Sequence, residues 1–472
     1  MEQLYRVLLK PARCAVDLGN GSERGLYVNQ DYILQRLGRP HRAINLMYCY
    51  YPLDKEWPAR ISEVMKPATT GDAWGYSYDD YFPFVGDAPF AQMADIRRHG
   101  QDVILTLTCD PAVTDDMITA IAEKLRPYGR IMLRLNHECT GSWFAYNKRC
   151  TYQEVADFFV RFCRVLRKTA PNVQVILCAG SIDGEKLEKE EEFTEAARTA
   201  DIWSLDQYLS LNWGWPNEVA EKDNFNHKTS NVRGIFDLLH RSYDRYCVVN
   251  GGQGKPMQVA EFNDDGDVLG PVAQARRVRE FYDLIEREGD GWLTGLTMYQ
   301  FRDDGRLGLE ITDPNNPEVG IPQPLLGTYR EIIHRPYFTP AMEAQPLENA
   351  AMPLRWGGAE DAEGIGMEVR LEREPVFCEA VFENVLKDMN LMLCFRGRWF
   401  AKKPGVDRVD LLSSFWEKPM DGPETTMLTL FAPPADGKNP VTDQPDWDVN
   451  YRAVLPSLPA MRIRYEGCMT EV

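Results

Sequence analysis

The sequence has few positive charges for its length, and this shortage excludes several kinds of partner. Its 472 residues carry 53 Lys and Arg against 71 Asp and Glu, a formal net charge of −18. A protein that binds the phosphate backbone of nucleic acids needs a basic surface, and anionic membrane surfaces attract basic segments. We therefore expect neither nucleic acid nor a membrane as a partner, whereas neutral ligands such as sugars are compatible with this charge.

The sequence also lacks long hydrophobic runs and the spacing of a metal site. No stretch reaches the ~18 consecutive apolar residues of a membrane-spanning helix, and the first ten residues lack the apolar run of a signal peptide. The 11 Cys include no C-x-x-C pair and the 6 His stand singly, so the usual spacings of zinc ligands are absent. We expect no cofactor, no metal and a cytoplasmic location with reduced thiols, or secretion if a leader has been removed.

Residues 1–338 alternate short apolar segments with helical patterns. Strands buried on both faces read as short, nearly continuous apolar runs between polar, Gly or Pro residues. Eight segments fit this description: Arg13–Leu18, Ala43–Cys49, Asp102–Thr108, Arg130–Asn136, Val173–Ala179, Ile202–Gln207, Met257–Glu261 and Thr294–Gln300. Eight strands that alternate with helices over this length indicate a (β/α)8 TIM barrel. The alternative, an open doubly wound sheet, usually carries a Gly-rich phosphate turn after its first strand, and that turn is incomplete at residues 17–22.

The pattern changes after the barrel. Residues 339–353 are rich in Pro, Ala, Glu and Met without periodicity, and we interpret them as a linker. In residues 354–472 the apolar segments are short and partly alternating, with turn signals between some of them: Gly366–Leu371, Val376–Phe382, Leu391–Phe395, Thr426–Phe431 and Met461–Tyr465. This pattern predicts a small antiparallel β domain, a sandwich, at the C-terminus.

Two of the predicted strands end in acidic residues. Strand alternation places Arg134, Asn136 and Glu138 on one face at the end of the fourth strand. Glu261 ends the seventh strand. The carboxyl ends of barrel strands form the mouth where catalytic groups lie. Two carboxylates across this mouth are what cleavage of a glycosidic bond needs, one as acid and one at the anomeric carbon. Arg134 is the candidate cation that keeps one of them ionised.

Both motifs resemble those of clan A glycoside hydrolases, retaining enzymes built on (β/α)8 barrels. The similarity is greatest to glycoside hydrolase family 26, the β-mannanase family. The residues that carry it are Arg134, His137, Glu138, Gly141, Trp143 and Phe144 in the first motif, and Lys255, Pro256, Ala260 and Glu261 in the second.

The resemblance implies roles for several side chains. Glu138 is then the acid/base and Glu261 the nucleophile. His137 contacts the sugar at the −1 position, Trp143 and Phe144 shape the sugar subsites, and Tyr208 matches a Tyr that hydrogen-bonds the nucleophile. Further substrate contacts are expected from residues at or beyond the strand ends: Arg134, Asn136, Trp213 and Tyr299. Trp213 could equally be a hydrophobic staple, and Asp206 could support the site.

The sequence therefore predicts a retaining glycoside hydrolase that cleaves β-glycosidic bonds by double displacement. Its expected substrate and partner is a β-linked oligo- or polysaccharide, a β-mannan or a related β-glucan or xylan. Two alternatives remain open: a carbohydrate-binding barrel without catalysis, and a transglycosylase that uses the same carboxylate pair.

Overall fold

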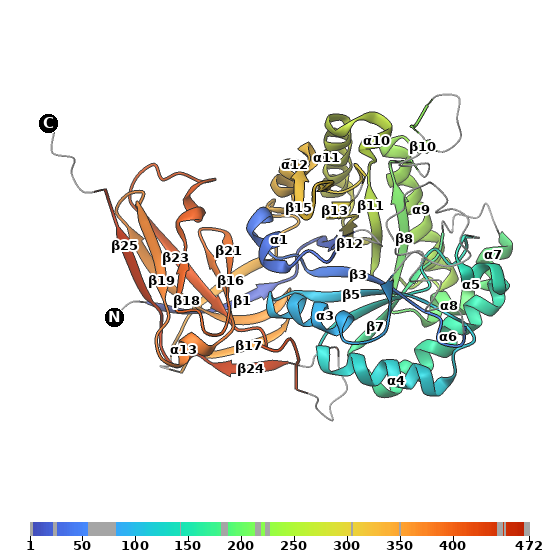
Figure 1. Ribbon diagram of the computed structural model, residues 1–472, viewed down its shortest axis with the longest axis horizontal. Coiled ribbons are helices and arrows are strands. Elements are labelled where there is room, and N and C mark those ends of the chain that lie inside the picture. Colours follow the sequence, from blue (N-terminus) through green and yellow to red (C-terminus); the bar gives the residue numbers. More distant parts are fainter. Residues whose placement is uncertain are drawn as a thin grey trace.

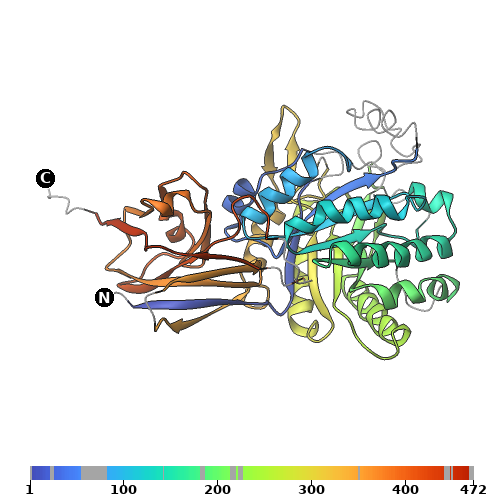
Figure 2. The same cartoon turned by 90° about the horizontal axis from the view of Figure 1, so that it is seen from below.

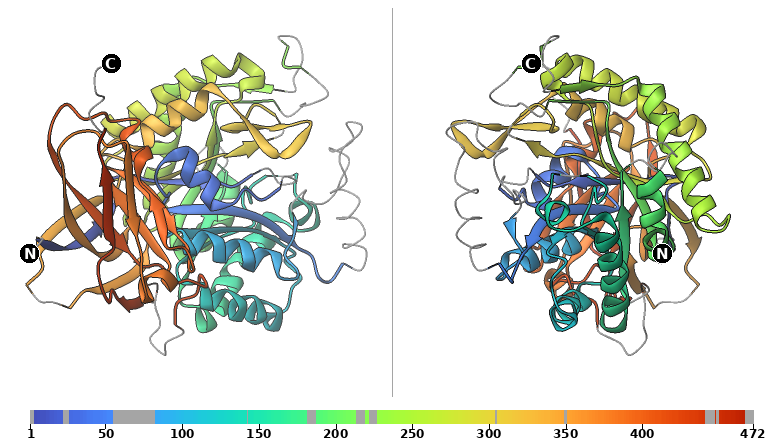
Figure 3. Two further views of the ribbon diagram at one scale, coloured as in Figure 1. Left: turned by 60° about the vertical axis from the view of Figure 1, so that its left-hand side comes forward. Right: turned by 90° about the vertical axis from the view of Figure 1, so that its right-hand side faces the viewer.

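The computed structural model describes residues 3–21, 26–54, 82–141, 143–180, 187–212, 219–221, 227–303, 305–348, 351–440, 447 and 450–466. In these residues the chain forms a parallel β-barrel with surrounding helices, followed by antiparallel β sheets (Figure 1). The turned views show the antiparallel sheets at one end of the molecule and the barrel at the other (Figure 2 and Figure 3). None of the described helices combines the length and the apolar character that crossing a membrane requires.

Eight parallel strands make the barrel, in the order of the chain around the ring, and pairing of the first with the second closes it. They are β2 (Ala15–Gly19), β3 (Ala43–Tyr50), β5 (Asp102–Cys109), β6 (Ile131–Leu135), β7 (Val173–Cys178), β8 (Ile202–Tyr208), β11 (Met257–Asn263) and β12 (Leu293–Met298). Every residue of β5 and of β11 is buried, which explains the nearly continuous apolar run at residues 103–107 of β5. The eight predicted strands and the TIM barrel are confirmed.

Helices cover the outside of the ring, and the longer ones bury one apolar face. The principal ones are α1 (Gln30–Leu37), α3 (Ala88–Arg98), α4 (Asp115–Leu125), α6 (Tyr152–Thr169), α8 (Thr194–Thr199), α9 (Val232–Val249), α11 (Pro271–Glu288) and α12 (Pro324–Ile333). Shorter ones are α5 (Ala145–Arg149), α7 (Leu187–Glu192) and α10 (Gly266–Leu269). Helix α6 begins with a capping box in which Thr151 and Glu154 satisfy each other's backbone N–H groups.

Two antiparallel sheets form the C-terminal β domain. The larger contains β1 (Leu4–Lys10), β16 (Ala341–Pro346), β17 (Pro353–Gly358), β18 (Asp361–Leu371), β20 (Leu391–Phe395), β21 (Arg398–Lys402), β23 (Glu424–Phe431) and β24 (Tyr451–Val454). The smaller contains β19 (Phe377–Val381), β22 (Arg408–Asp410) and β25 (Ala460–Arg464). Alternate residues of both sheets share one apolar core that includes Ile365, Leu393, Leu428, Ala380 and Val409. The expected antiparallel β domain is confirmed.

Two segments lie differently from expectation. Residues 4–10, which we assigned to the barrel, form β1 and pair with β16 and β18 of the β domain. Residues 341–346, which we assigned to the linker, form β16. A local pattern shows that a segment can be a strand but not which sheet it joins, and β16 is exposed along its whole length, so no apolar face marks it. The boundaries at 338 and 354 otherwise stay a prediction.

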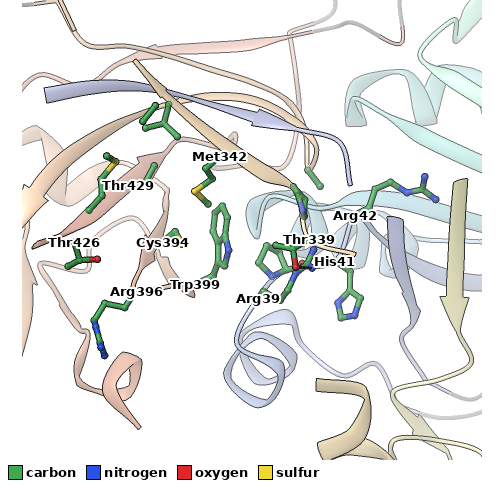
Figure 4. Close-up of a pocket in the computed structure, with 17 residues that line it drawn as sticks. Arg39, His41, Arg42, Thr339, Met342, Cys394, Arg396, Trp399, Thr426 and Thr429 are labelled. Carbon is green, nitrogen blue, oxygen red and sulfur yellow. Dashed lines mark hydrogen bonds between the residues drawn. The ribbon is translucent and has the colours of Figure 1, made fainter. Parts of the chain in front are cut away.

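The barrel and the β domain are joined at the amino ends of the barrel strands. Leu34 of α1 packs among Val7, Trp356 and Trp399 of the β domain. A cavity of about 410 Å³ lies between the two parts. Figure 4 shows the ring of Trp399 between Cys394 and Thr426 on one side and Arg39, Thr339 and His41 on the other. Since residues 39–42 precede β3, this cavity is at the end of the barrel opposite to the carboxyl ends of the strands.

A buried ion pair supports this junction and gives a test of it. Arg97 Nη1 lies 2.6 Å from Asp102 Oδ1, with side chains 0% and 5% exposed, and Arg97 Nη2 donates to Asn439 of the β domain. We expect Asp102→Ala to lower the free energy of unfolding by about 3–5 kcal/mol, because the guanidinium stays buried without its anion. Urea denaturation measures this loss.

The matched control is an exposed pair on the barrel surface. Arg233 and Glu288 lie 2.8 Å apart with side chains 52% and 41% exposed, so Glu288→Ala is expected to cost at most about 1 kcal/mol. An equal cost for Asp102→Ala and Glu288→Ala would contradict the role given to the buried pair.

Candidate active site

Arg134 is the charged centre of the residues at the carboxyl ends of the barrel strands. Its side chain is fully buried. It donates to Glu261 Oε1 at 2.5 Å, to Asp206 at 2.9 and 3.0 Å, and to Thr106 Oγ1 at 2.8 Å. Burial alone would lower the pKa of Arg134, but the negative charges of Asp206 and Glu261 hold that pKa well above its ordinary value. One guanidinium thus binds two carboxylates.

Glu261 is held at both of its oxygens. Oε1 accepts from Arg134, and Oε2 accepts from the hydroxyl of Tyr208 at 2.7 Å. On β11 it lies in register with Asp206 of β8, next to an irregularity of the ladder between Val259 and Glu261. Such bulges re-aim a side chain. Hydrogen bonds from a cation and a phenol orient this carboxylate and stabilise its negative charge. The expected bond from Tyr208 is present in the structure.

Glu138 follows β6 in a loop with unusual backbone. Asn136 and Glu138 both have positive φ, 46° and 52°, which is uncommon for residues other than Gly. Glu138 Oε2 accepts from the indole N–H of Trp143 at 2.8 Å. Burial, and after it the charge of Glu261, raises the pKa of Glu138 to about 7, while Trp143 and the charges of Arg134 and Lys228 oppose the rise.

Gly141 allows Trp143 to reach back to Glu138. A Cβ on Gly141 would come within 2.7 Å of the indole ring, so a larger residue would displace the ring from its hydrogen bond. Trp143 is 54% exposed, which leaves part of the indole open to a ligand. The Gly and the Trp of this motif therefore act together on the carboxyl group of Glu138.

His137 lies beside the nucleophile candidate. Its Nε2 is 3.9 Å from Glu261 Oε1, and its ring packs on Phe144 with 4.7 Å between centroids. Burial lowers the pKa of His137 well below its ordinary value, and the charge of Arg134 lowers it further. The imidazole is therefore neutral at physiological pH. It can offer a ligand a hydrogen bond but no positive charge.

The other predicted contacts fall into three groups. Asn136 exchanges hydrogen bonds with the backbone N–H and C=O of Cys109, so its observed role is to hold the end of β6 against β5. Tyr299 packs edge-on against Tyr208 with 5.8 Å between ring centroids, while Phe144, which is 9% exposed, stacks on Tyr146. Trp213 lies outside the described residues. Direct contact of these residues with substrate stays a prediction.

The structure adds Lys228 and Thr106, which sequence reasoning did not assign to the site. Lys228 lies on a short strand, β10 (His227–Thr229), with no hydrophobic pattern to locate it. Its ammonium is 6.0 Å from the centroid of the Tyr208 ring. Thr106 is one of the buried residues of β5 and offers no sequence signal beyond its place on a strand. Asp206, by contrast, lies near the end of a predicted strand, and the sequence analysis named it as a residue that could support the site.

Three potential metal ligands meet here, but their surroundings do not fit a cation. Donor atoms of His137, Asp206 and Glu261 lie within 4.8 Å of one another. The guanidinium of Arg134 already donates to both carboxylates, and its positive charge would repel a metal ion. We assign no metal to these residues.

Replacing Trp143 tests its hydrogen bond to Glu138. In Trp143→Phe the charged carboxylate loses a donor, so the pKa of Glu138 is expected to rise above its wild-type value. Carbon-13 NMR titration of glutamate-labelled protein measures the change, with Glu138→Gln identifying the resonance. Trp416→Phe, at a 75% exposed position of the β domain, is the control. An unchanged or lower pKa in Trp143→Phe would contradict this assignment.

The raised pKa of Glu138 also predicts how stability depends on pH. The folded protein binds this proton more tightly than the unfolded chain, whose Glu pKa is about 4.3. The contribution of this proton to the free energy of unfolding is therefore lost as the pH rises through about 7. Glu138→Gln removes the loss. We expect the variant to gain about 1–3 kcal/mol relative to wild type between pH 5 and pH 8, measured by denaturation at both pH values. If the free energies of unfolding of Glu138→Gln and wild type differed by the same amount at both pH values, the raised pKa of Glu138 would be refuted.

Comparisons with known proteins give a likeness in fold only. No family model matches the chain and no curated protein matches it. Similar structures include a family 51 α-L-arabinofuranosidase from Thermotoga petrophila (12% identity, TM-score 0.45, covering 97% of this chain and 99% of that one). A second is a family 39 glycoside hydrolase from Bacteroides cellulosilyticus (11% identity, TM-score 0.42, covering 89% of this chain and 80% of that one). A third is a family 26 β-mannanase from Bacteroides ovatus (12% identity, TM-score 0.41, covering 69% of this chain and 90% of that one). The three structures come from three glycoside hydrolase families, and at these values none argues for an activity or substrate.

Proposed function

We propose that this protein is a retaining β-glycoside hydrolase with Glu261 as nucleophile and Glu138 as acid/base. One observation carries the proposal: two carboxyl groups at one end of the barrel have opposite environments. Glu261 accepts hydrogen bonds from Arg134 and Tyr208, which suit a carboxylate. Glu138 has a pKa of about 7 and interacts with the charge of Glu261. Different environments for two carboxyl groups are the basis of acid and nucleophile roles in glycoside cleavage.

In the first step, an oxygen of Glu261 attacks the anomeric carbon while the bond from that carbon to the leaving oxygen breaks. Glu138 gives its proton to the leaving oxygen. In the second step, Glu138 takes a proton from water, the water oxygen bonds to the anomeric carbon, and the ester to Glu261 breaks. For retention of configuration, the two carboxyl groups are expected to lie about 5–5.5 Å apart.

The charges around Glu138 support its change of role between the two steps. The negative charge of Glu261 is one reason why the pKa of Glu138 is raised. When Glu261 becomes an ester its charge disappears, so the pKa of Glu138 falls and the group becomes a carboxylate ready to accept a proton. Arg134 still has Asp206 as an ion partner at 2.9 Å at this stage, so its buried charge stays compensated.

For the substrate, we propose a β-linked oligo- or polysaccharide of the β-mannan, β-glucan or xylan class. The support for mannan is the similarity of the two sequence motifs to those of β-mannanases. Trp143, half-exposed next to Glu138, offers an aromatic face on which a sugar ring can pack. Screening manno-, gluco- and xylo-oligosaccharides, with product sizing, identifies the sugar and the mode of cleavage.

Substitution of the two carboxyl groups tests their roles. Glu261→Ala and Glu138→Ala are each expected to lower kcat at least about a thousandfold, with unchanged circular dichroism. Glu331→Ala, an exposed residue paired with Arg279, is the control and is expected to keep full turnover. Binding of oligosaccharide by the wild type without hydrolysis would instead indicate a carbohydrate-binding barrel.

Azide separates the two roles. In Glu138→Ala, azide can attack the glycosyl-enzyme from the side that water uses and is expected to give a β-glycosyl azide. In Glu261→Ala, azide fills the place of the nucleophile and is expected to give the α-azide from an activated β-glycoside. Proton NMR of the products distinguishes the anomers. The opposite pairing of anomers with variants would reverse the assignments.

A further inference from the structure

Lys228 reaches the site through a small hairpin that follows β8. Strand β10 pairs antiparallel with β9 (Ser210–Asn212), with Lys228 opposite Leu211. This pairing brings Lys228 back over Tyr208, whose ring centroid is 6.0 Å from the ammonium nitrogen. Tyr208 in turn donates to Glu261, and the charge of Lys228 acts on Glu138. Lys228 therefore lies beside the Tyr208 ring, close enough for its charge to act on Glu138.

The ammonium of Lys228 is partly buried and lies over the ring of Tyr208. Among the described residues, no carboxylate lies within 4.0 Å of its nitrogen and no hydrogen bond to it is formed. Burial lowers the pKa of Lys228, which the charge of Glu138 partly opposes. Arg134, the other cation whose charge reaches Glu138, is in contrast fully engaged by Asp206, Glu261 and Thr106. Lys228 is thus a cation near Glu138 whose hydrogen-bond donors are not used by any of the described residues.

We propose that Lys228 binds a carboxylate of the substrate, so that the site takes β-linked sugars containing a uronic acid. This inference rests on the proposed glycoside hydrolase function and names a substrate class for it. An ammonium has three donors and no acceptor, and its strongest partner is a carboxylate. At physiological ionic strength, charges more than about 8 Å apart are largely screened from each other. The net charge of −18 therefore does not prevent an acidic substrate from binding next to Lys228.

The acid step gives a reason for a substrate carboxylate at this position. Glu138 must carry a proton to act as acid, yet the positive charges of Arg134 and Lys228 oppose that proton, while the negative charge of Glu261 favours it. Trp143 also stabilises the ionised form through its hydrogen bond. A carboxylate bound to Lys228 cancels one of the opposing charges. An acidic substrate therefore improves both its own binding and the protonation of Glu138.

Matched substrates and variants test the proposal. The probes are 4-nitrophenyl β-D-glucuronide against the β-D-glucoside, and xylo-oligosaccharides with against without a glucuronic acid branch. In Lys228→Met the ratio of kcat/KM for the acidic over the neutral probe is expected to fall about 10- to 100-fold, the range given by hydrogen bonds to charged groups. Lys228→Arg is expected to keep most of the ratio. Lys168→Met, at an exposed position of α6, is expected to leave it unchanged.

The pH dependence of kcat supplies a second readout. For wild type, the basic limb is expected at higher pH with the acidic probe than with the neutral one, because a bound carboxylate raises the pKa of Glu138. In Lys228→Met this difference is expected to vanish. Equal ratios and equal basic limbs in wild type and Lys228→Met would overturn the proposal, even if hydrolysis itself is observed.

A binding measurement separates this proposal from the proposed function. Calorimetric titration of Glu261→Gln with the branched and unbranched xylo-oligosaccharides requires no turnover. Tighter binding of the branched probe that is lost in Glu261→Gln/Lys228→Met supports the role of Lys228, even if no hydrolysis is found with wild type. Equal binding of both probes, or binding of neither, overturns it.

Discussion

A single buried guanidinium organises the reactive end of the barrel. Arg134 has no exposed surface and donates to residues of three other strands: Thr106 of β5, Asp206 of β8 and Glu261 of β11. An isolated buried charge costs several kcal/mol, which only close anions and hydrogen bonds offset. The barrel places these partners next to Arg134, since Asp206 and Glu261 are in register on neighbouring strands. The fold and the electrostatics of the site therefore depend on each other.

The two carboxyl groups differ because one lies on a strand and the other on a loop. Glu261 belongs to a fully buried strand and has a fixed pair of donors. Glu138 lies where the backbone of Asn136 and Glu138 is left-handed, a conformation that costs of the order of 1 kcal/mol or more per residue. Hydrogen bonds of Asn136 to Cys109 and of the Gly141 N–H to the Glu138 carbonyl stabilise it. The loop thereby places the carboxyl group of Glu138 where burial and the charge of Glu261 raise its pKa.

The sequence predicted the barrel because the strands are buried on both faces, which leaves uninterrupted apolar runs such as residues 103–107. It predicted the carboxylates because Glu138 and Glu261 end such runs. It could not reveal that Asn136 turns to the backbone of Cys109, since alternation describes a regular strand and the backbone leaves that geometry at Asn136. Nor could it place Lys228, because the position of that residue depends on the pairing of two strands of three residues each, β9 and β10, whose sequences have no periodicity.

The position of β1 has a consequence for how the molecule is assembled. This strand precedes the barrel in the chain, yet its partners β16 and β18 follow the whole barrel. In topological terms, the barrel is an insertion between the first two strands of a β sheet. The segment of β1 must stay without these partners until residues 341–371 have been made. Separating the two parts by cutting the chain once, between β1 and the barrel, would leave the sheet without an inner strand. Such distant pairings are slow to form, so the barrel is the part expected to fold first.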